Sequence, residues 1–154
     1  MQAPRISKVV VNVGTGKITK DAKMLERIEK DLAKITGQKP AVRAAKKSIA
    51  GFKLREGSPV GLTVTLRGTR MYDFIDRLIS VALPRSRDFQ GLLPRSFDEK
   101  GNLNIGIKEH NIFPEITYES LKDIFGLEVT IVTNAGSRER GISFLKFMGF
   151  PIKI

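Results

Sequence analysis

Cysteine and tryptophan are absent from this 154-residue sequence, and histidine occurs only once, at His110. Without cysteine the chain can form neither disulfides nor thiolate metal sites, and a single histidine excludes sites that need several. No run approaches the roughly 20 apolar residues of a membrane-spanning helix, and residues 1–5 lack the apolar core of a signal peptide. We therefore expect a cytoplasmic protein with no membrane contact, no metal and no cofactor.

Acidic residues are scarce, 16 against 27 lysines and arginines, which leaves a net charge of +11. Residues 38–70 carry eight basic residues and one acidic residue, a net of +7. Such a segment attracts phosphate, and nucleic acid is the usual partner. An anionic membrane would instead favour a basic amphipathic helix, and a merely solvated face would mix both signs of charge.

The stretch VVVNVGTGK, residues 9–17, resembles a phosphate-binding loop but fails the test of spacing. A P-loop has glycine five places before its second glycine and a hydroxyl residue after the lysine. Here those positions hold Val11 and Ile18, and a dinucleotide fingerprint lacks its third glycine at Thr19. We predict a strand-to-helix turn. An enzyme remains an alternative, based on this loop and on acids such as Asp73, Asp76 and Glu109.

Apolar periodicity predicts an α+β fold. Residues alternate as in strands over 6–13, 41–47, 59–68, 103–108 and 127–133. Helical spacing covers 19–36, 71–83, 118–125 and 137–148. Thr19 and Gly37 are expected to cap the first helix, Pro84 to end the second, and Phe144, Leu145 and Met148 to form the apolar stripe of the last. With no repeat or linker, we expect one domain over residues 1–154.

The strand order favours an antiparallel sheet with helices packed on one face and the other face open for RNA. Alternation places polar side chains on that open face: Lys8, Asn12, Thr63, Thr65, Arg67 and Thr130. Hydroxyl, amide and cationic groups suit RNA, although an ordinary solvated face also favours threonine. The predicted strands lack the stacking aromatic pairs of single-strand readers, which indicates docking on a folded RNA.

Five longer stretches carry a family resemblance: QAPRISKVVVNVGTGK near the start, GQKPAVRAAKKSIAGFKLREGSPVG (37–61), VTLRGTRMYDFIDRLI (64–79), PRSRDFQGL (84–92) and IFPEI (112–116). Together they resemble the bacterial large-subunit ribosomal protein that binds 5S rRNA, the fifth protein of that subunit. The resemblance covers nearly the whole chain. One departure is that family members usually carry a helix before the QAPRI block, so either the lineage lacks that helix or the start is misassigned.

The resemblance implies a non-catalytic constituent of the ribosome that takes part in translation. Its implied partners are 5S rRNA in the central protuberance, 23S rRNA, peptidyl-site tRNA, neighbouring central-protuberance proteins and a small-subunit head protein across an intersubunit bridge. A free-standing RNA chaperone or assembly factor would share the basic sheet and stays open as an alternative.

The resemblance also implies site residues. For 5S rRNA these are Asn12, Gln38 and Thr65, with Lys8, Lys39, Arg43 and Arg67 as charged contacts. Strand alternation adds Thr63, and Lys17 is a candidate phosphate contact that could equally be exposed to solvent. The loop 48–57 and its approach would contact tRNA through Lys46, Lys47, Ser48, Phe52, Lys53 and Arg55. Phe52 could stack on a base or anchor the loop.

Overall fold

A computed structural model describes residues 3–14, 22–44, 59–86, 91–116 and 124–153. Within these ranges the chain forms one five-stranded sheet in the order β2-β3-β1-β5-β4, and every neighbouring pair is antiparallel. The strands are β1 (Ile6–Gly14), β2 (Ala41–Ala44), β3 (Pro59–Leu66), β4 (Leu103–Ile107) and β5 (Leu127–Thr133). The predicted α+β antiparallel fold is confirmed.

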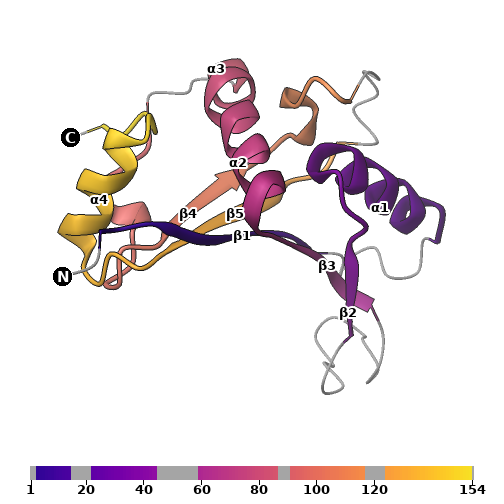
Figure 1. The fold of residues 1–154 in the computed structure, drawn as a ribbon. Helices are drawn as coiled ribbons and strands as arrows, with labels where there is room; N and C mark the ends of the chain where they lie inside the picture. The colour runs from indigo at the N-terminus through magenta and orange to yellow at the C-terminus, as the bar shows by residue number, and fades with distance from the viewer. Residues whose placement is uncertain (1–2, 15–21, 45–58, 87–90, 117–123, 154) are drawn as a thin grey trace.

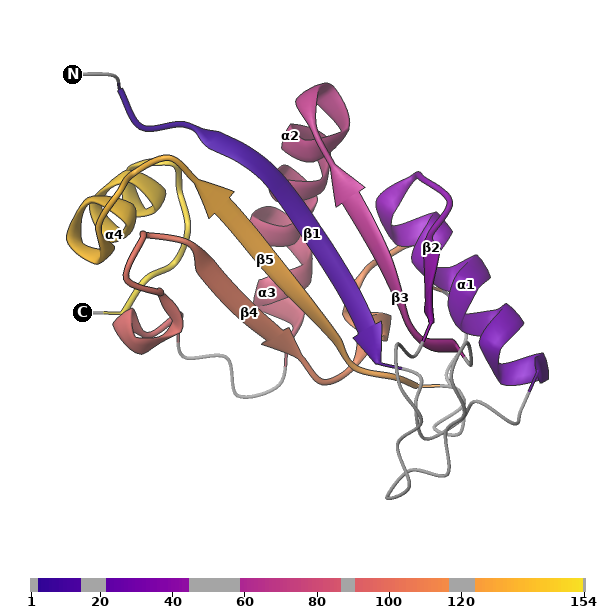
Figure 2. The same ribbon diagram turned by 90° about the horizontal axis from the view of Figure 1, so that it is seen from below.

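In the described ranges, the helices leave one face of the sheet uncovered. They are α1 (Ala22–Thr36), α2 (Gly68–Arg77), the π-helical turn η2 (Leu78–Ala82), α3 (Leu83–Arg85) and α4 (Arg138–Phe147), with short 3-10 turns η3 (Pro94–Ser96) and η4 (His110–Ile112). In Figure 1 α1, α2 and α3 lie on the same side of the sheet, and α4 lies beyond the end of β5. Figure 2 views the opposite face, where the five strands lie in front of the helices.

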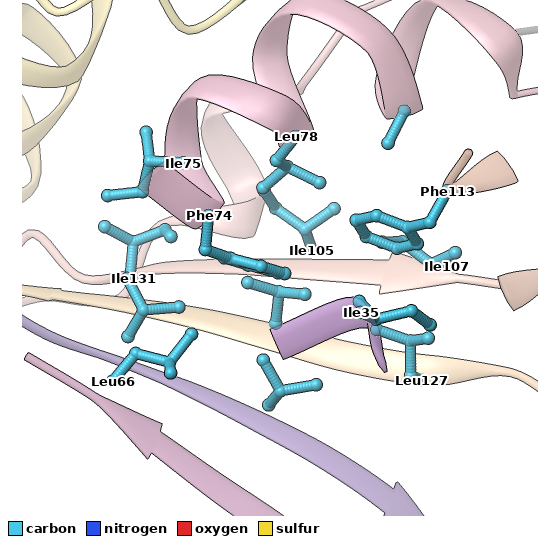
Figure 3. Close-up of a cluster of buried hydrophobic side chains, with 14 of the residues drawn as sticks. Ile35, Leu66, Phe74, Ile75, Leu78, Ile105, Ile107, Phe113, Leu127 and Ile131 are labelled. Atoms are coloured by element: carbon cyan, nitrogen blue, oxygen red, sulfur yellow. The ribbon is translucent and has the colours of Figure 1, made fainter. Parts of the chain in front are cut away.

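The core fills the space between the sheet and this helix layer. Alternate residues of the strands point into it, so Val9, Val11 and Val13 of β1 are buried while Asn12 is exposed. Figure 3 shows Phe74 and Leu78 from the second helix packed over Ile105 and Ile131 of the sheet. Phe113 joins this cluster, with its ring centroid 5.8 Å from that of Phe74. The burial of these rings fixes which face of the sheet is covered.

The end of α1 follows the prediction. Gly37 adopts a left-handed φ of +76°, which residues with a side chain rarely adopt, and its N–H donates to the carbonyl of Ala33 at 2.7 Å. The expected cap at Thr19 and most of the helix predicted over 118–125 lie outside the described residues, so both stay predictions.

The second helix differs from the prediction at both ends. It begins at Gly68, three residues early, and it continues past Pro84 to Arg85. The Leu83 N–H donates to the carbonyl of Leu78, a π-type bond that closes one helical segment and opens another. Pro84 then stands in the first turn of that new segment, where its missing N–H costs no hydrogen bond. The prediction that Pro84 ends the helix was wrong.

The last helix packs through a narrower apolar surface than expected. Leu145 is buried and Phe144 partly buried, but Met148 caps the helix and is 37% exposed. Gly141 brings α4 against the turn at Gly101, because a Cβ at position 141 would lie 2.5 Å from the Gly101 carbonyl oxygen. The backbone of α4 therefore packs against Gly101 at Gly141, and Met148 does not belong to the buried stripe that was predicted for it.

A buried polar pair fastens α1 to the segment after β4. His110 is fully buried, and its Nε2 lies 3.1 Å from Oδ2 of Asp31. The Phe125 N–H donates to Nδ1 at 3.3 Å, so Nε2 carries the proton and donates it to Asp31. The Phe125 ring stacks on the imidazole with centroids 3.8 Å apart. The neutral imidazole therefore fits this site without a second proton.

This geometry predicts a stability that falls in mild acid. Burial lowers the pKa of His110 below its ordinary value of 6.5, against the opposing effect of the Asp31 hydrogen bond and charge. The unfolded chain then binds a proton that the folded chain does not, so the free energy of unfolding should decrease as pH falls below about 6.5.

The measurement is urea unfolding between about pH 7.5 and 5, with NMR titration of the imidazole. The sequence contains one histidine, so the signal has one assignment. A His110→Gln variant should show a flatter pH dependence of stability over the same range. A folded-state midpoint at or above the ordinary histidine value would contradict the prediction.

Candidate nucleic-acid interface

The open face of the sheet presents a row of polar side chains that strand pairing places side by side. Asn12 on β1 lies opposite Thr63 on β3 and Glu128 on β5, and Thr65 lies opposite Val10 in the next row. Asn12 is exposed and Thr65 is partly exposed, as predicted, and both alternate with buried core residues of their strands. These two predicted site residues therefore share one accessible surface.

Thr63 lies on the same face but differs from the expectation. Only 5% of it is exposed. Its strand is central in this part of the sheet, and Thr63 is flanked by Asn12 on one side and Ala41 on the other. A short side chain between two neighbours offers little surface to a ligand. We therefore place Thr63 in the support of this face and not among its direct contacts.

Gln38 has a role within the protein that the sequence did not reveal. Pairing of β2 with β3 begins at Ala41 and Thr63, so the edge of β3 at Thr65 lies beyond the β2 ladder. The Gln38 Nε2 donates to the Thr65 carbonyl at 3.0 Å and takes the place of a strand partner there. Arg70 donates to the Gln38 Oε1 at 3.4 Å. Gln38 thus holds the strand that presents Thr65.

Cations border the face. Lys39, Arg43 and Arg67 are exposed and Lys8 is partly buried, and none of the four forms a salt bridge with another described residue. Unpaired cations can neutralise phosphates and release counterions when RNA binds. In the described part of the chain, no cluster of three metal-ligating acids or histidines occurs. The remaining predicted contacts, Lys17, Lys46, Lys47, Ser48, Phe52, Lys53 and Arg55, lie outside the described residues.

The structure adds two features that periodicity alone did not single out. Glu128, a carboxylate, is exposed on this otherwise cationic face. Beside it is an open concavity of about 750 Å³, lined by Asn12, Gly14, Gly106 and Lys108 among others. Its lining residues lie at the end of the sheet where β1 and β4 terminate. Figure 2 shows these two strands ending on the same side of the sheet. Strand alternation predicts Glu128 on the outward face, but only the register places it beside Asn12.

Sequence comparison identifies the family. Residues 1–55 match the sequence profile of ribosomal protein L5, and residues 59–152 match the profile of the C-terminus of the same ribosomal family. The chain belongs to the ribosomal protein L5 family. This confirms the resemblance on which the site residues were chosen.

Known L5 proteins are similar over almost all of this chain. The large ribosomal subunit protein uL5 of Chloroflexus aggregans is 56% identical over 153 residues, which span 99% of this chain and 85% of the relative. That of Herpetosiphon aurantiacus is 55% identical over 153 residues, 99% and 86% of the two chains. The uL5 of Halothermothrix orenii is 53% identical over 151 residues, 98% and 84%.

Membership of the L5 family settles the class of protein. The chain is a ribosomal protein that serves as a structural constituent of the large subunit in translation, in contact with rRNA, and it is not an enzyme. The nucleotide-dependent enzyme considered for the Val9–Lys17 stretch is thus rejected. None of the helices in the described ranges is long and apolar enough to cross a membrane.

The hydrogen bond from Gln38 to the Thr65 carbonyl should stabilise the end of β3, and this can be tested. In Gln38→Ala the Thr65 carbonyl has no side-chain donor, so the free energy of unfolding should drop by about 0.5–1.5 kcal/mol. Urea unfolding measures the change. Arg70→Ala is the matched control, because it removes only the weaker 3.4 Å hydrogen bond to the same amide. Equal stability of Gln38→Ala and wild type would show that the strand edge does not depend on this bond.

Proposed function

We propose that this L5-family chain binds 5S rRNA in the central protuberance of the large subunit through the open face of its sheet. Residues 1–154 act in this proposal as a single RNA-binding domain. The observation that carries it is the asymmetry of the sheet. One face is closed by α1 and α2, while the other presents Asn12 and Thr65, surrounded by cations that form no salt bridge with another described residue.

The chemistry of that face suits folded RNA. The Thr65 hydroxyl and Asn12 amide can both donate and accept hydrogen bonds, which matches phosphates, 2′-hydroxyls and base edges. Lys39, Arg43 and Arg67 supply the counterion release that makes RNA binding favourable. The exposed large apolar residues of the described chain are Val42, Tyr72, Phe147 and Met148, and none belongs to a stacking pair on this face. The described part of this face therefore binds RNA through hydrogen bonds and charge and not through aromatic stacking.

The basic segment between β2 and β3 supports a second contact. It carries Lys46, Lys47, Lys53 and Arg55, with Ser48 and Phe52 between them. We propose that it reaches the backbone of peptidyl-site tRNA, as the family resemblance implies. Contacts with 23S rRNA, with neighbouring proteins of the central protuberance and with a small-subunit head protein belong to the same proposal.

The double variant Asn12→Ala with Thr65→Ala tests the open face. Both side chains point away from the core, so 5S rRNA affinity should fall by roughly ten-fold or more with unchanged circular dichroism. Filter binding against tRNA competitor at several salt concentrations measures it. Thr69→Ala with Ser143→Ala, two exposed hydroxyls of the helices, is the control and should bind normally. Unchanged affinity of the open-face variant would refute the assignment.

A second test asks whether the sheet binds 5S rRNA while the segment between β2 and β3 binds tRNA. The variant replaces four basic residues by alanine: Lys46, Lys47, Lys53 and Arg55. Affinity for 5S rRNA should be retained, whereas binding of tRNA to ribosomes assembled with the variant should weaken. The log–log salt slope for tRNA should decrease by roughly 0.7–0.9 for every phosphate that the variant no longer neutralises. Collapse of 5S rRNA binding would show that the loop belongs to the same interface as the sheet.

A further inference from the structure

The concavity beside Asn12 contains glycines that the fold itself does not require. Gly14 and Gly106 lie in strands, and neither has the left-handed φ seen at Gly37, Gly68, Gly91, Gly101, Gly136 and Gly149. A Cβ added at either position would meet no heavy atom within 4 Å. Glycine in a strand costs conformational entropy and often marks close approach of a ligand. No described residue fills the space above Gly106, so a ligand can approach the backbone there.

Glu128 stands next to that space. Register puts Gly106, Glu128 and Asn12 in one line across β4, β5 and β1. Side chains directly opposite on one face have Cβ atoms about 4.5–5.5 Å apart, so Glu128 and Asn12 can hold one ligand together. Glu128 forms no salt bridge with the described residues. The only groups a carboxylate attracts in RNA are hydrogen-bond donors, because phosphates repel it.

We propose that Glu128 and Asn12 read the Watson–Crick edge of an unpaired guanine of the RNA, seated over Gly106. This inference rests on the proposed function, in which the open face binds 5S rRNA. The two carboxylate oxygens accept from the guanine N1–H and N2–H, and the Asn12 Nδ2 donates to O6. Unpaired bases splayed from folded RNA are the usual targets of sequence-specific recognition.

Guanine is the base that fits this pair. Its Watson–Crick edge places two donors side by side, which matches the two acceptors of an ionised carboxylate. Adenine and cytosine present one amino donor next to a ring nitrogen acceptor, and that acceptor would face the second carboxylate oxygen. Uracil presents one donor between two carbonyl oxygens. The carboxylate therefore selects for guanine and against the other three bases.

Glu128→Gln tests the inference, because a guanine-reading Glu128 and a merely solvated Glu128 predict opposite changes in 5S rRNA affinity. If Glu128 reads guanine, the amide offers one acceptor fewer and turns a donor toward N–H groups, so 5S rRNA affinity falls by roughly ten-fold or more. If Glu128 is only a solvated acid, removal of a negative charge strengthens binding to any RNA. Glu26→Gln, an exposed acid on α1 with the same charge change, is the matched control. It should bind as tightly as wild type or slightly tighter.

Gly106→Ala is a second, independent variant. Its melting temperature should be unchanged or higher, because alanine fits this backbone and reduces the freedom of the unfolded chain. Its affinity for 5S rRNA should nevertheless fall, because the added methyl group occupies the space of the base. Normal affinity with normal folding would show that the concavity holds no base.

Inosine substitution identifies the base. Inosine lacks the N2 amino group, so replacement of one unpaired guanine of 5S rRNA should weaken binding to the wild-type chain and cause no further weakening with Glu128→Gln. Suppose that the wild type prefers 5S rRNA to tRNA, that Glu128→Gln binds 5S rRNA equally tightly, and that inosine weakens binding at no position. This result would overturn the guanine inference but not the proposed function. Wild type that does not prefer 5S rRNA would overturn the proposed function instead.

Discussion

The burial of apolar side chains between one face of the sheet and the helices α1 and α2 is the constraint on which the rest of the structure depends. Phe74, Phe113 and Leu78 press onto the inward side chains of the strands, and all three are fully buried. Because strand side chains alternate, this packing sends every second residue to the other face. Asn12 and Glu128 are exposed there, and Thr65 is partly exposed, because Val11, Val64 and Val129 are buried.

The open face is rigid for the same reason. A contact surface built on strands holds its side chains in fixed register, and the ladders of β1 with β3 and β5 set the spacing of Asn12, Thr63 and Glu128. Gln38 extends this support beyond the end of β2. The buried His110–Asp31 pair secures α1 from the opposite side. A preorganised surface loses little entropy on binding, which suits a protein that assembles onto folded RNA.

Much of this fold could be predicted from local sequence pattern. Alternation located β1, β3, β4 and β5 to within two residues at each end, because each strand has one buried and one open face. The exceptions depend on tertiary contacts. Pro84 fits inside a helical segment because a π-type turn precedes it. The backbone of α4 packs closely against Gly101 at Gly141, a contact that apolar periodicity does not indicate.

The candidate site was less predictable from pattern. Asn12 and Thr65 follow from alternation, since each lies between buried neighbours. The burial of Thr63 and the bond from Gln38 to Thr65 involve residues paired across strands or 27 positions apart, and no local pattern encodes them. The pairing of Glu128 with Asn12 likewise depends on register across 116 positions of the chain.

The proposed function requires that RNA cover the open face and leave the helix layer free. The absence of cysteine allows a direct measurement, in which single cysteines are placed at Val10, Thr65 or Thr130 on the open face and at Asp76 or Ser80 on the helix side. Modification by a thiol reagent is then timed with and without 5S rRNA. If RNA binds the open face, only the open-face cysteines should be protected. Protection of the helix-side cysteines with continued reactivity of the open face would contradict it.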